Sequence, residues 1–360
     1  MKILVLGGAG DIGSGIAEAL CSSPIDRVVV GDINYPKARF VAEFLKSRGC
    51  NVEAVKVNAL DIDSLRDASS DVDVVVNSVG PFYKYGYEIA KNIVSLGLNF
   101  VDVCDDYDAA EKILSLNEEA ARRGVLGVVG FGWTPGLSNI LALHASSELR
   151  EVDSIDIYWV GSAADSRGLA VVMHLFHSLI GKVPMYINGS RVYVEAGSGA
   201  VAVEFPKPIG RVKLYYTGHP EPITLPKYVN VRNRVTVRGG LVPSWQSGLA
   251  KLLLRLFRVK DDKGVERLSK LVHRIEDVFR WGGLQLSAVR VDVTGYSRTI
   301  SLVAMDRMRR LTGIPAALAA IMIASGELSD KGVKPPEAVI KDTGEFLRKL
   351  SDKGINVVKM

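Results

Sequence analysis

The sequence predicts an α/β Rossmann fold, a doubly wound parallel sheet, followed by an α+β domain with a largely antiparallel sheet. Over about the first 130 residues, short apolar runs alternate with segments of helical periodicity. A glycine-rich turn joins the first apolar run to the first helical segment. After this region the hydrophobic period becomes two in several runs, which is typical of antiparallel strands with one solvated face.

The length of 360 residues favours two domains over a single core. We place a dinucleotide-binding domain at 1–130 and a second, substrate-binding domain at 131–304. The last segment, 305–360, is again helical and could fold back to complete the first domain.

The first thirty-two residues carry the strongest functional signal. An apolar run, Lys2–Leu6, is followed by Gly8-x-Gly10-x-x-Gly13 and then by a helical pattern. A second apolar run ends on Asp32, nineteen residues after the last glycine. Such glycines permit a tight turn and let backbone amides approach a pyrophosphate, and the acid accepts hydrogen bonds from a ribose. The stretch therefore predicts dinucleotide binding.

The rest of the first domain continues the alternation of strands and helices. Further strands are predicted at 27–31, 52–57, 72–77, 99–103 and 126–129. Helices are predicted at 36–48, 62–69, 87–96 and 109–123, with a loop at 78–86. Because ligands bind at the carboxyl ends of such strands, the turns there supply the predicted cofactor-binding residues. These are Gly8, Gly10, Asp11, Ile12, Gly13, Asp32, Asn58, Ala59, Ser78, Gly80, Pro81 and Phe82.

The second half begins at Gly130–Gly136, where Thr134 could cap a helix that starts with Pro135 and runs to about Leu149. Strands of period two follow at 155–159, 191–194, 201–205, 211–216, 234–238 and 289–293. A helical insert, 245–280, mixes basic and acidic residues, and we interpret it as a solvated face in preference to a polyanion site. In the C-terminal segment, the periodicity predicts three helices. They lie at 305–311, from Thr312 onward, and from Pro335 to Leu350.

Composition narrows the class of protein. The net charge of +5 is modest and gives no reason to expect a nucleic-acid partner. Three cysteines at unrelated spacings form no metal motif and cannot all pair internally, which favours a reducing cytoplasm. The chain opens on a predicted strand, so no signal peptide is expected. The most apolar late segment, 314–325, is too short to span a membrane.

Four groups of residues resemble the saccharopine dehydrogenase-like oxidoreductases, and among them the short archaeal L-lysine dehydrogenase type. They are the glycine turn with Asp32, the segment 77–82 with Tyr85-Gly86, Phe100-Val101-Asp102, and the segment 130–139. Segments 312–315 and 332–337 are also similar to that family. The resemblance implies a nicotinamide-dependent oxidoreductase that acts on a C–N bond of an amino acid or secondary amine. It also implies a homodimer built through the sheet of the second domain.

Oxidation of an amine to an imine requires a hydride acceptor, a base and polar anchors. The nicotinamide is expected near Gly80, Pro81 and Phe82. Clustered acids at the end of the fifth strand are candidates to handle the proton, because neighbouring carboxylates raise one another's pKa. The predicted catalytic residues are Asp102, Asp105, Lys84 and Tyr85, with Asp106 as a further acid of this cluster.

Other polar residues carry weaker signals. Arg167, Arg232 and Arg234 could bind a substrate carboxylate, although surface roles are more common. His174 and His177 lie three residues apart, but no carboxylate or cysteine at ligand spacing accompanies them, so no metal site is predicted. His219 lies in a predicted turn and could reach a substrate.

Two alternatives stay open, together with the choice of cofactor. Tyr87-x-x-x-Lys91 resembles the catalytic pair of short-chain dehydrogenases and epimerases, but it follows the fourth strand and not the fifth. A nicotinamide-binding sensor or assembly protein without catalysis would keep the same glycine turn. Asp32 favours NAD over NADP, while Lys37 and Arg39 leave NADP possible.

Overall fold

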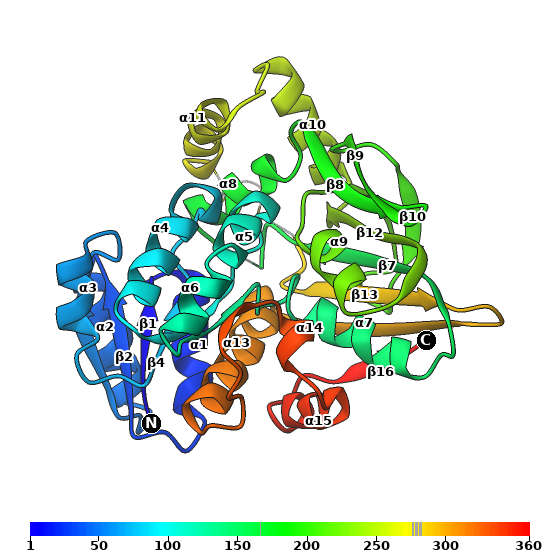
Figure 1. Ribbon diagram of the computed structural model, residues 1–360. Helices are drawn as coiled ribbons and strands as arrows, with labels where there is room; N and C mark the ends of the chain where they lie inside the picture. The colour runs from blue at the N-terminus through cyan, green and yellow to red at the C-terminus, as the bar shows by residue number, and fades with distance from the viewer. Residues whose placement is uncertain (166, 276, 278–279, 281–282) are drawn as a thin grey trace. The chain divides into compact units, whose positions relative to one another are not determined.

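The computed structural model describes residues 1–165, 167–275, 277, 280 and 283–360. These residues form two compact units, whose elements are labelled in Figure 1. Unit 1 comprises Met1–Leu137 and Thr312–Lys341, and unit 2 comprises Ser138–Leu311 and Asp342–Met360. The C-terminal segment is thus shared between the two units.

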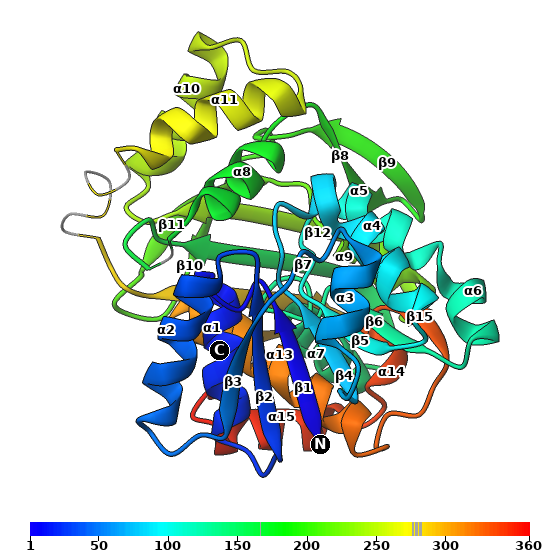
Figure 2. The same cartoon turned by 90° about the vertical axis from the view of Figure 1, so that its left-hand side faces the viewer.

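Unit 1 is built on a seven-stranded sheet in the order β15-β6-β5-β4-β1-β2-β3, and every pairing in it is parallel. The strands are β1 (Lys2–Leu6), β2 (Arg27–Asp32), β3 (Val52–Lys56), β4 (Val74–Asn77), β5 (Asn99–Asp102), β6 (Leu126–Val129) and β15 (Gly332–Lys334). Figure 2 shows β3, β2, β1 and β4 side by side. The strand order reverses between β1 and β4, as in a doubly wound fold. The predicted Rossmann fold is confirmed.

The helices of unit 1 connect these parallel strands. They are α1 (Asp11–Cys21), α2 (Tyr35–Lys46), α3 (Ile62–Ala68), α4 (Phe82–Ser95), α5 (Tyr107–Leu114), α6 (Asn117–Arg122), α14 (Pro336–Val339) and, from Thr312 on, α13 (Met308–Ala324). Strand interiors such as Ile3–Leu6 and Val74–Val76 are fully buried. This burial explains why the strands read as continuous apolar runs in the sequence.

The predicted start of the fourth helix was wrong. α4 begins at Phe82, five residues before the predicted Tyr87, so Lys84 and Tyr85 lie on its first turn and not in a loop. Pro81 is extended and occupies the N-cap position, and the backbone N–H of Tyr83 donates to Oδ2 of Asp106 at 2.9 Å. The capping group comes from another loop, so the local sequence gave no sign of it.

Three further helix predictions were wrong in their bounds. The helix expected at 109–123 is divided into α5 and α6. The C-terminal helices are one continuous α13, with Pro315 inside it, and the separate α14 and α15 (Thr343–Asp352). Asp342 caps α15 by accepting the backbone N–H of Glu345 at 2.8 Å, and this starts a new helix where one long helix was expected.

Unit 2 contains a nine-stranded sheet in the order β10-β11-β12-β7-β13-β14-β16, with β8 paired to β12 and β9. The strands are β7 (Val152–Gly161), β8 (Lys182–Ile187), β9 (Ser190–Glu195), β10 (Val201–Glu204), β11 (Arg211–Tyr216), β12 (Val231–Leu241), β13 (Ser287–Thr294), β14 (Thr299–Asp306) and β16 (Val357–Lys359). Among the described strands of this sheet, only β12 and β7 pair in parallel, which confirms the prediction of a largely antiparallel sheet. β8, β14 and β16 were not predicted.

The helices of unit 2 include α7 (Leu137–Ser147), α8 (Leu169–His177), α9 (Glu221–Thr224), α10 (Trp245–Leu256) and α11 (Asp262–His273), along with α15. The prediction that α7 starts with Pro135 was wrong. The backbone N–H of Gly132 donates to the carbonyl of Pro135 at 3.0 Å, so this stretch is a tight turn before the helix. Positions 276, 278 and 279 of the predicted helical insert lie outside the described residues.

A disulfide joins Cys21 at the end of α1 to Cys50 just before β3. Cys104 is a free, buried thiol. The sequence analysis took the three cysteines as a sign of a reducing compartment. The Cys21–Cys50 disulfide removes this argument. Separately, no described helix of this chain is both long and apolar enough to span a bilayer.

Candidate functional site

The turn between β1 and α1 has the geometry that the glycine pattern predicts. Gly7 has a positive φ of 71°. A Cβ atom on Gly8 would lie 2.8 Å from Cγ1 of Val30, and one on Gly13 would lie 2.2 Å from the carbonyl oxygen of Gly7. Gly8 therefore lets the turn pack on β2, and Gly13 lets α1 start directly against the turn. This turn fits a dinucleotide pyrophosphate at the start of α1.

Asp32, the last residue of β2, is fixed beside this turn. Its Oδ2 accepts the backbone N–H of Ala9 at 3.1 Å, and its Oδ1 accepts that of Asn34 at 2.9 Å. Arg39, one of the two residues that left NADP possible, pairs with Glu43 on its own helix at 3.1 Å. The two hydrogen bonds to Asp32 give its carboxylate a defined orientation at the carboxyl end of the sheet, where a ribose would bind.

The other predicted cofactor-binding residues lie in turns at the same edge of the unit 1 sheet. Ser78 underlies the glycine turn: its Oγ donates to the carbonyl of Leu6 at 2.7 Å and would lie 2.7 Å from a Cβ on Gly13. Asn58, after β3, accepts the backbone N–H of Leu60 at 3.2 Å. The remaining members are Gly10, Asp11 and Ile12 at the start of α1, Ala59 after β3, and Gly80, Pro81 and Phe82 between β4 and α4.

Asp102 ends β5 and is completely buried. Its Oδ2 accepts the Nδ2 hydrogen of Asn77 at 2.7 Å, and its Oδ1 accepts the backbone N–H of Cys104 at 2.8 Å. The backbone carbonyl of Asp102 in turn accepts the N–H groups of Gly130 and Phe131 at 2.8 and 2.9 Å. Asp102 thus joins the ends of β4 and β5 to the loop after β6.

Burial raises the pKa of Asp102 to about 7, although the hydrogen bonds from Asn77 and Cys104 act to lower it. Between about pH 4 and pH 7 the unfolded chain has released this proton while the folded chain still holds it, so stability falls as the pH rises through this window. In Asp102→Asn this dependence disappears. As the pH rises through this window, the free energy of unfolding of the wild type should fall by up to about 4 kcal/mol relative to that of the variant. Urea denaturation at about pH 4 and pH 8 measures it, and equal pH dependence in both proteins would contradict the assignment.

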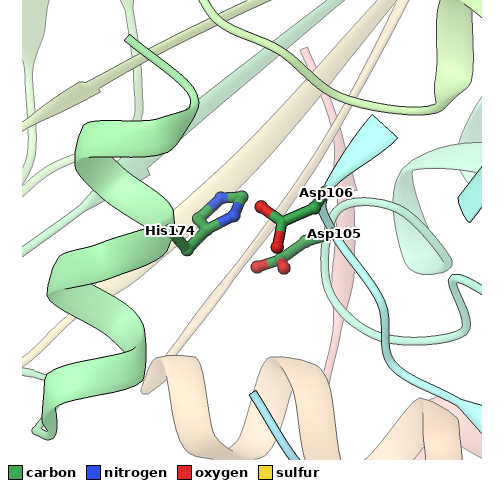
Figure 3. A group of neighbouring side chains, drawn as sticks. All are labelled: Asp105, Asp106 and His174. Atoms are coloured by element: carbon green, nitrogen blue, oxygen red, sulfur yellow. The ribbon is translucent and has the colours of Figure 1, made fainter. Parts of the chain in front are cut away.

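The two acids that follow have different surroundings. Asp106 is buried and caps α4 through Tyr83, whereas Asp105 is half-buried. Figure 3 shows the two side chains next to each other in the loop between β5 and α5. Of these two, Asp105 is therefore the acid that is more open to a ligand.

Lys84 and Tyr85 lie together on the first turn of α4. The Nζ atom of Lys84 is 5.3 Å from the ring centroid of Tyr85, and Lys84 is exposed. Tyr87 and Lys91 lie on the same helix, which follows β4 and not β5. This placement does not match the short-chain dehydrogenase pattern.

The helix α13 supports α1 by a close backbone contact within unit 1. A Cβ on Gly313 would lie 2.9 Å from the backbone of Gly15, and one on Gly132 would lie 3.0 Å from Cγ2 of Thr312. The segment 312–315 therefore brings a C-terminal helix against the helix that follows the glycine turn. The sequence analysis placed this segment in a C-terminal region that could fold back onto the first domain, but it did not predict the contact with α1.

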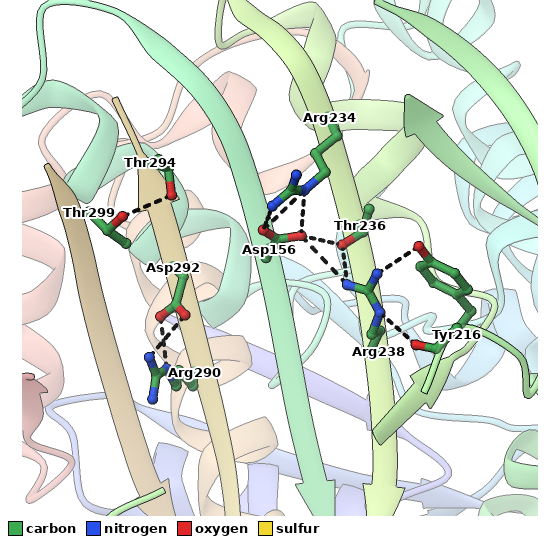
Figure 4. Close-up of polar contacts among 10 residues, drawn as sticks. Asp156, Tyr216, Arg234, Thr236, Arg238, Arg290, Asp292, Thr294 and Thr299 are labelled. Atoms are coloured by element: carbon green, nitrogen blue, oxygen red, sulfur yellow. Dashed lines mark hydrogen bonds and ion pairs between the residues drawn. The ribbon is translucent and has the colours of Figure 1, made fainter. Parts of the chain in front are cut away.

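In unit 2, ion pairs gather on one face of the sheet, as Figure 4 shows. Arg234 donates to Asp156 through Nε and Nη2, at 3.1 and 2.8 Å, and Thr236 donates to the same carboxylate at 2.6 Å. Arg290 pairs with Asp292 at 2.8 Å. Arg234, a predicted carboxylate anchor, is thus already paired, while Arg232 is exposed and Arg167 lies 4.0 Å from Asp277.

Three of the histidines of unit 2 lie in two groups. His177 on α8 lies 3.1 Å from Oδ1 of Asp262 through its Nδ1. His174, also on α8 and shown in Figure 3, has its ring centroid 5.4 Å from that of His219 in an edge-to-face arrangement. His219 is buried, and its Nδ1 lies 3.9 Å from Oε2 of the buried Glu221.

Comparisons with known proteins agree with this geometry. A family model described as the saccharopine dehydrogenase NADP binding domain matches residues 3–128. A carboxynorspermidine synthase of Vibrio alginolyticus is 23% identical and aligns over 87% of this chain and 84% of its own. The apo saccharopine dehydrogenase (L-Glu forming) of Saccharomyces cerevisiae superposes with a TM-score of 0.71 at 14% identity, covering 100% and 99% of the two chains. Residues 3–128 thus match the NADP-binding domain of saccharopine dehydrogenases, and the whole chain shares the fold of a saccharopine dehydrogenase.

An amine dehydrogenase of Mycobacterium smegmatis also shares the fold, with a TM-score of 0.50 at 10% identity over 95% and 96% of the two chains. The matched domain and the shared fold support an NAD(P)-binding oxidoreductase fold for this chain. The predicted cofactor class is confirmed, and the glycine turn of this chain has the geometry for it.

Sequence reasoning missed several polar residues of this chain. Asn77 was noted as part of a motif, but its contact with Asp102 was not foreseen. Glu221, Ser138 and Asp156 were not singled out as polar groups. No local pattern marks the contacts of these side chains, and only the fold brings their partners close.

Proposed function

We propose that this protein is an NAD-dependent dehydrogenase that acts on the C–N bond of an amino acid or secondary amine through an imine, as in lysine or saccharopine dehydrogenases. The observation that carries the proposal is the acid cluster Asp102, Asp105 and Asp106, held at the carboxyl edge of an NAD(P)-binding sheet. One similar protein is a carboxynorspermidine synthase, and two solved structures with this fold are a saccharopine dehydrogenase and an amine dehydrogenase. These names favour small amines and amino acids as substrates.

The bound nicotinamide would accept the hydride from the carbon next to the nitrogen. The glycine turn would bind the pyrophosphate, and Asp32 the adenosine ribose. Gly80, Pro81 and Phe82 would border the nicotinamide. Asp105, the half-buried acid, would accept the amine proton, while Asp102 and Asn77 would hold the end of β5 in place. Lys84 and Tyr85 would contribute polar contacts from the first turn of α4.

Replacing Asp32 by alanine tests the preference for NAD. The variant is expected to bind NAD more weakly by about 1.5–3 kcal/mol, because it loses hydrogen bonds to a charged group. It should discriminate less against NADP, since the charge that repels a 2′-phosphate is gone. Calorimetric titration with both cofactors measures this. Asp71→Ala, which removes an exposed acid paired with Lys2, is the matched control, and unchanged NAD affinity in Asp32→Ala would contradict the assignment.

Replacing Asp105 by asparagine tests proton handling. We expect Asp105→Asn to keep its affinity for NAD and to slow hydride transfer from the amine by about 100-fold, the usual scale for loss of a general base. The measurement is the rate of NADH formation in a single turnover with an amine that the wild-type protein oxidises. Full activity of both Asp105→Asn and Asp102→Asn would overturn the proposed role of this acid cluster.

The oligomeric state belongs to the same proposal. We expect a homodimer formed through the sheet of unit 2, whose polar face carries the ion pairs of Asp156 and Asp292. Light scattering after gel filtration should give about twice the chain mass of 39.0 kDa. A monomeric mass at micromolar concentration would exclude this dimer. A sensor without catalysis, the remaining alternative, would bind NAD but show no amine-dependent reduction.

A further inference from the structure

The helix α10 of unit 2 carries large apolar side chains on a face that the fold leaves exposed. Trp245, Leu252 and Leu256 are 56%, 49% and 65% exposed. Together with the half-buried Leu249, they follow the spacing that places residues on one face of an α-helix. We call these four residues the apolar stripe. Phe257, at the C-terminal cap of α10, is 55% exposed as well. A group of adjacent exposed apolar side chains marks an interaction surface, whereas single ones do not.

α10 is fixed to unit 2 through its other face. Ser247, Ala250 and Leu254 are buried and belong to that face. The Oγ of Ser247 accepts the backbone N–H of Leu241, the last residue of β12, at 2.7 Å. The helix therefore joins the core of unit 2 without using the apolar stripe.

Positive charge borders the apolar stripe. The stretch 245–260 contains no acidic residue. Its basic residues are Lys251, Arg255, Arg258 and Lys260. The two acids that follow have other partners, since Asp261 accepts the backbone N–H of Gly264 at 2.8 Å and Asp262 lies 3.1 Å from His177. The apolar stripe, Phe257 and these four basic residues form what we call the α10 surface.

The charges around Lys251 are positive. Its Nζ donates to the carbonyl of Gly197 at 2.7 Å and lies 3.8 Å from the ring centroid of Tyr215. The Nζ of Lys213, on β11, lies 5.9 Å from the same centroid. Desolvation and then repulsion by Lys213 and Arg255 lower the pKa of Lys251. Because these neighbours add positive charge, an anion beside Lys251 would be stabilised.

We infer that the α10 surface binds the surface of a bilayer that contains anionic lipids. A helix lies in the plane of the membrane interface when Trp, Phe and Leu occupy one face and Lys or Arg border it. Trp245 and the leucines of the stripe enter the boundary between head groups and acyl chains. The basic side chains extend to the lipid phosphates. Such a contact involves one leaflet and needs no helix that spans the membrane.

The charge of the α10 surface favours this occupant over two others. In a contact with a second copy of this chain, two sets of basic residues would face each other, and like charges oppose such a contact. A soluble polyanion would pair with the basic residues but would leave Leu252 and Leu256 in water. The interpretation of the insert 245–280 as a solvated face does not account for these two leucines. Anionic lipids complement both the charge and the apolar stripe.

Co-sedimentation with vesicles tests the inference. The wild-type protein should bind vesicles of equal parts phosphatidylglycerol and phosphatidylcholine, more strongly at low salt. It should bind pure phosphatidylcholine at least about tenfold more weakly. Leu252→Ser/Leu256→Ser should lower the partition coefficient at least about tenfold, because less apolar surface leaves water. Arg255→Gln/Lys260→Gln should lower it about 30-fold on the anionic vesicles, because two attractions to the lipid charge are lost.

Trp245 reports the same contact by fluorescence. On addition of anionic vesicles, the emission of the wild-type protein should shift to shorter wavelength as this indole leaves water. Trp245→Phe should still bind the vesicles but should lack the shift. Binding without any shift in the wild-type protein would place the contact elsewhere and would overturn the inference.

Two controls match the double variants. Tyr296→Ser removes a 95%-exposed ring in the turn between β13 and β14. Lys46→Gln/Lys112→Gln removes two exposed charges from α2 and α5. Both controls should bind vesicles as the wild type does. Since the residues changed in the leucine and charge variants are exposed, their melting temperatures should match that of the wild type.

Three results would overturn the inference. The first is a lack of binding of the wild-type protein to the anionic vesicles. The second is loss of binding in the charge variant with full binding in the leucine variant, which is the behaviour of a polyanion site. The third is a smaller particle mass of the leucine variant in light scattering without vesicles, which would assign the stripe to a second copy. None of these measurements depends on NADH formation, so the dehydrogenase proposal is tested separately.

Discussion

Replacement of Gly13 by alanine is expected to weaken NAD binding about 100-fold, which corresponds to about 2.7 kcal/mol. The new methyl group would lie 2.2 Å from the carbonyl oxygen of Gly7 and 2.7 Å from Oγ of Ser78. Since both neighbours belong to the floor of the turn, α1 must move away from β1. The amides that should receive the pyrophosphate would then lose their alignment.

Calorimetric titration of NAD into Gly13→Ala and wild type measures this effect. Gly248→Ala is the matched control, because Gly248 lies on α10 with no atom within 4 Å of an added Cβ. This control should bind NAD as wild type does and should be more stable by about 0.5–1 kcal/mol, as expected for alanine in a helix. If Gly13→Ala bound NAD with wild-type affinity, the glycine turn would not be the pyrophosphate site.

Loss of the Cys21–Cys50 disulfide should lower the free energy of unfolding by about 3–4 kcal/mol. The bond closes a loop with a sequence separation of 29 residues, which spans β2 and α2. Without it the unfolded chain gains conformational entropy that the folded chain does not. Because both cysteines lie in unit 1, we also expect the melting temperature of unit 1 to fall.

Guanidinium denaturation of Cys21→Ser, Cys50→Ser and the double variant measures this loss. The three should be equally destabilised, since either single change removes the same bond. A reducing agent should bring wild type to the stability of the variants and leave the variants unchanged. Wild-type stability in the double variant would show that the bond does not form in solution.

Much of unit 1 was predictable because its signals are local. Val74–Val76 and Ile3–Leu6 are buried on both faces, so their runs are continuously apolar. A Cβ atom on Gly8 would clash with Val30, and one on Gly13 would clash with Gly7, so both glycines are required by neighbours that are close in the sequence. The strands of unit 2 were partly predictable for the same reason, since Ile155 and Ile157 alternate with the polar face of β7.

The missed features depend on contacts between distant segments. The start of α4 is set by Asp106, which is 23 positions from Tyr83. The burial of Asp102 follows from its place in the sheet, and its partner Asn77 is 25 positions away. Neither the approach of Gly313 to Gly15 nor that of Ser138 to Glu221 has a local pattern. Sequence periodicity therefore located the cofactor turn but not the residues that position the acids.

The most direct test of the C–N dehydrogenase is NADH formation with a panel of amines. The panel should contain lysine, saccharopine and a carboxyalkyl polyamine, with a simple alcohol as the control substrate. We predict that at least one amine reduces NAD and yields a carbonyl compound and an amine in equal amounts with NADH. Reduction by the alcohol alone, or NAD binding with no reduction by any amine, would contradict the account.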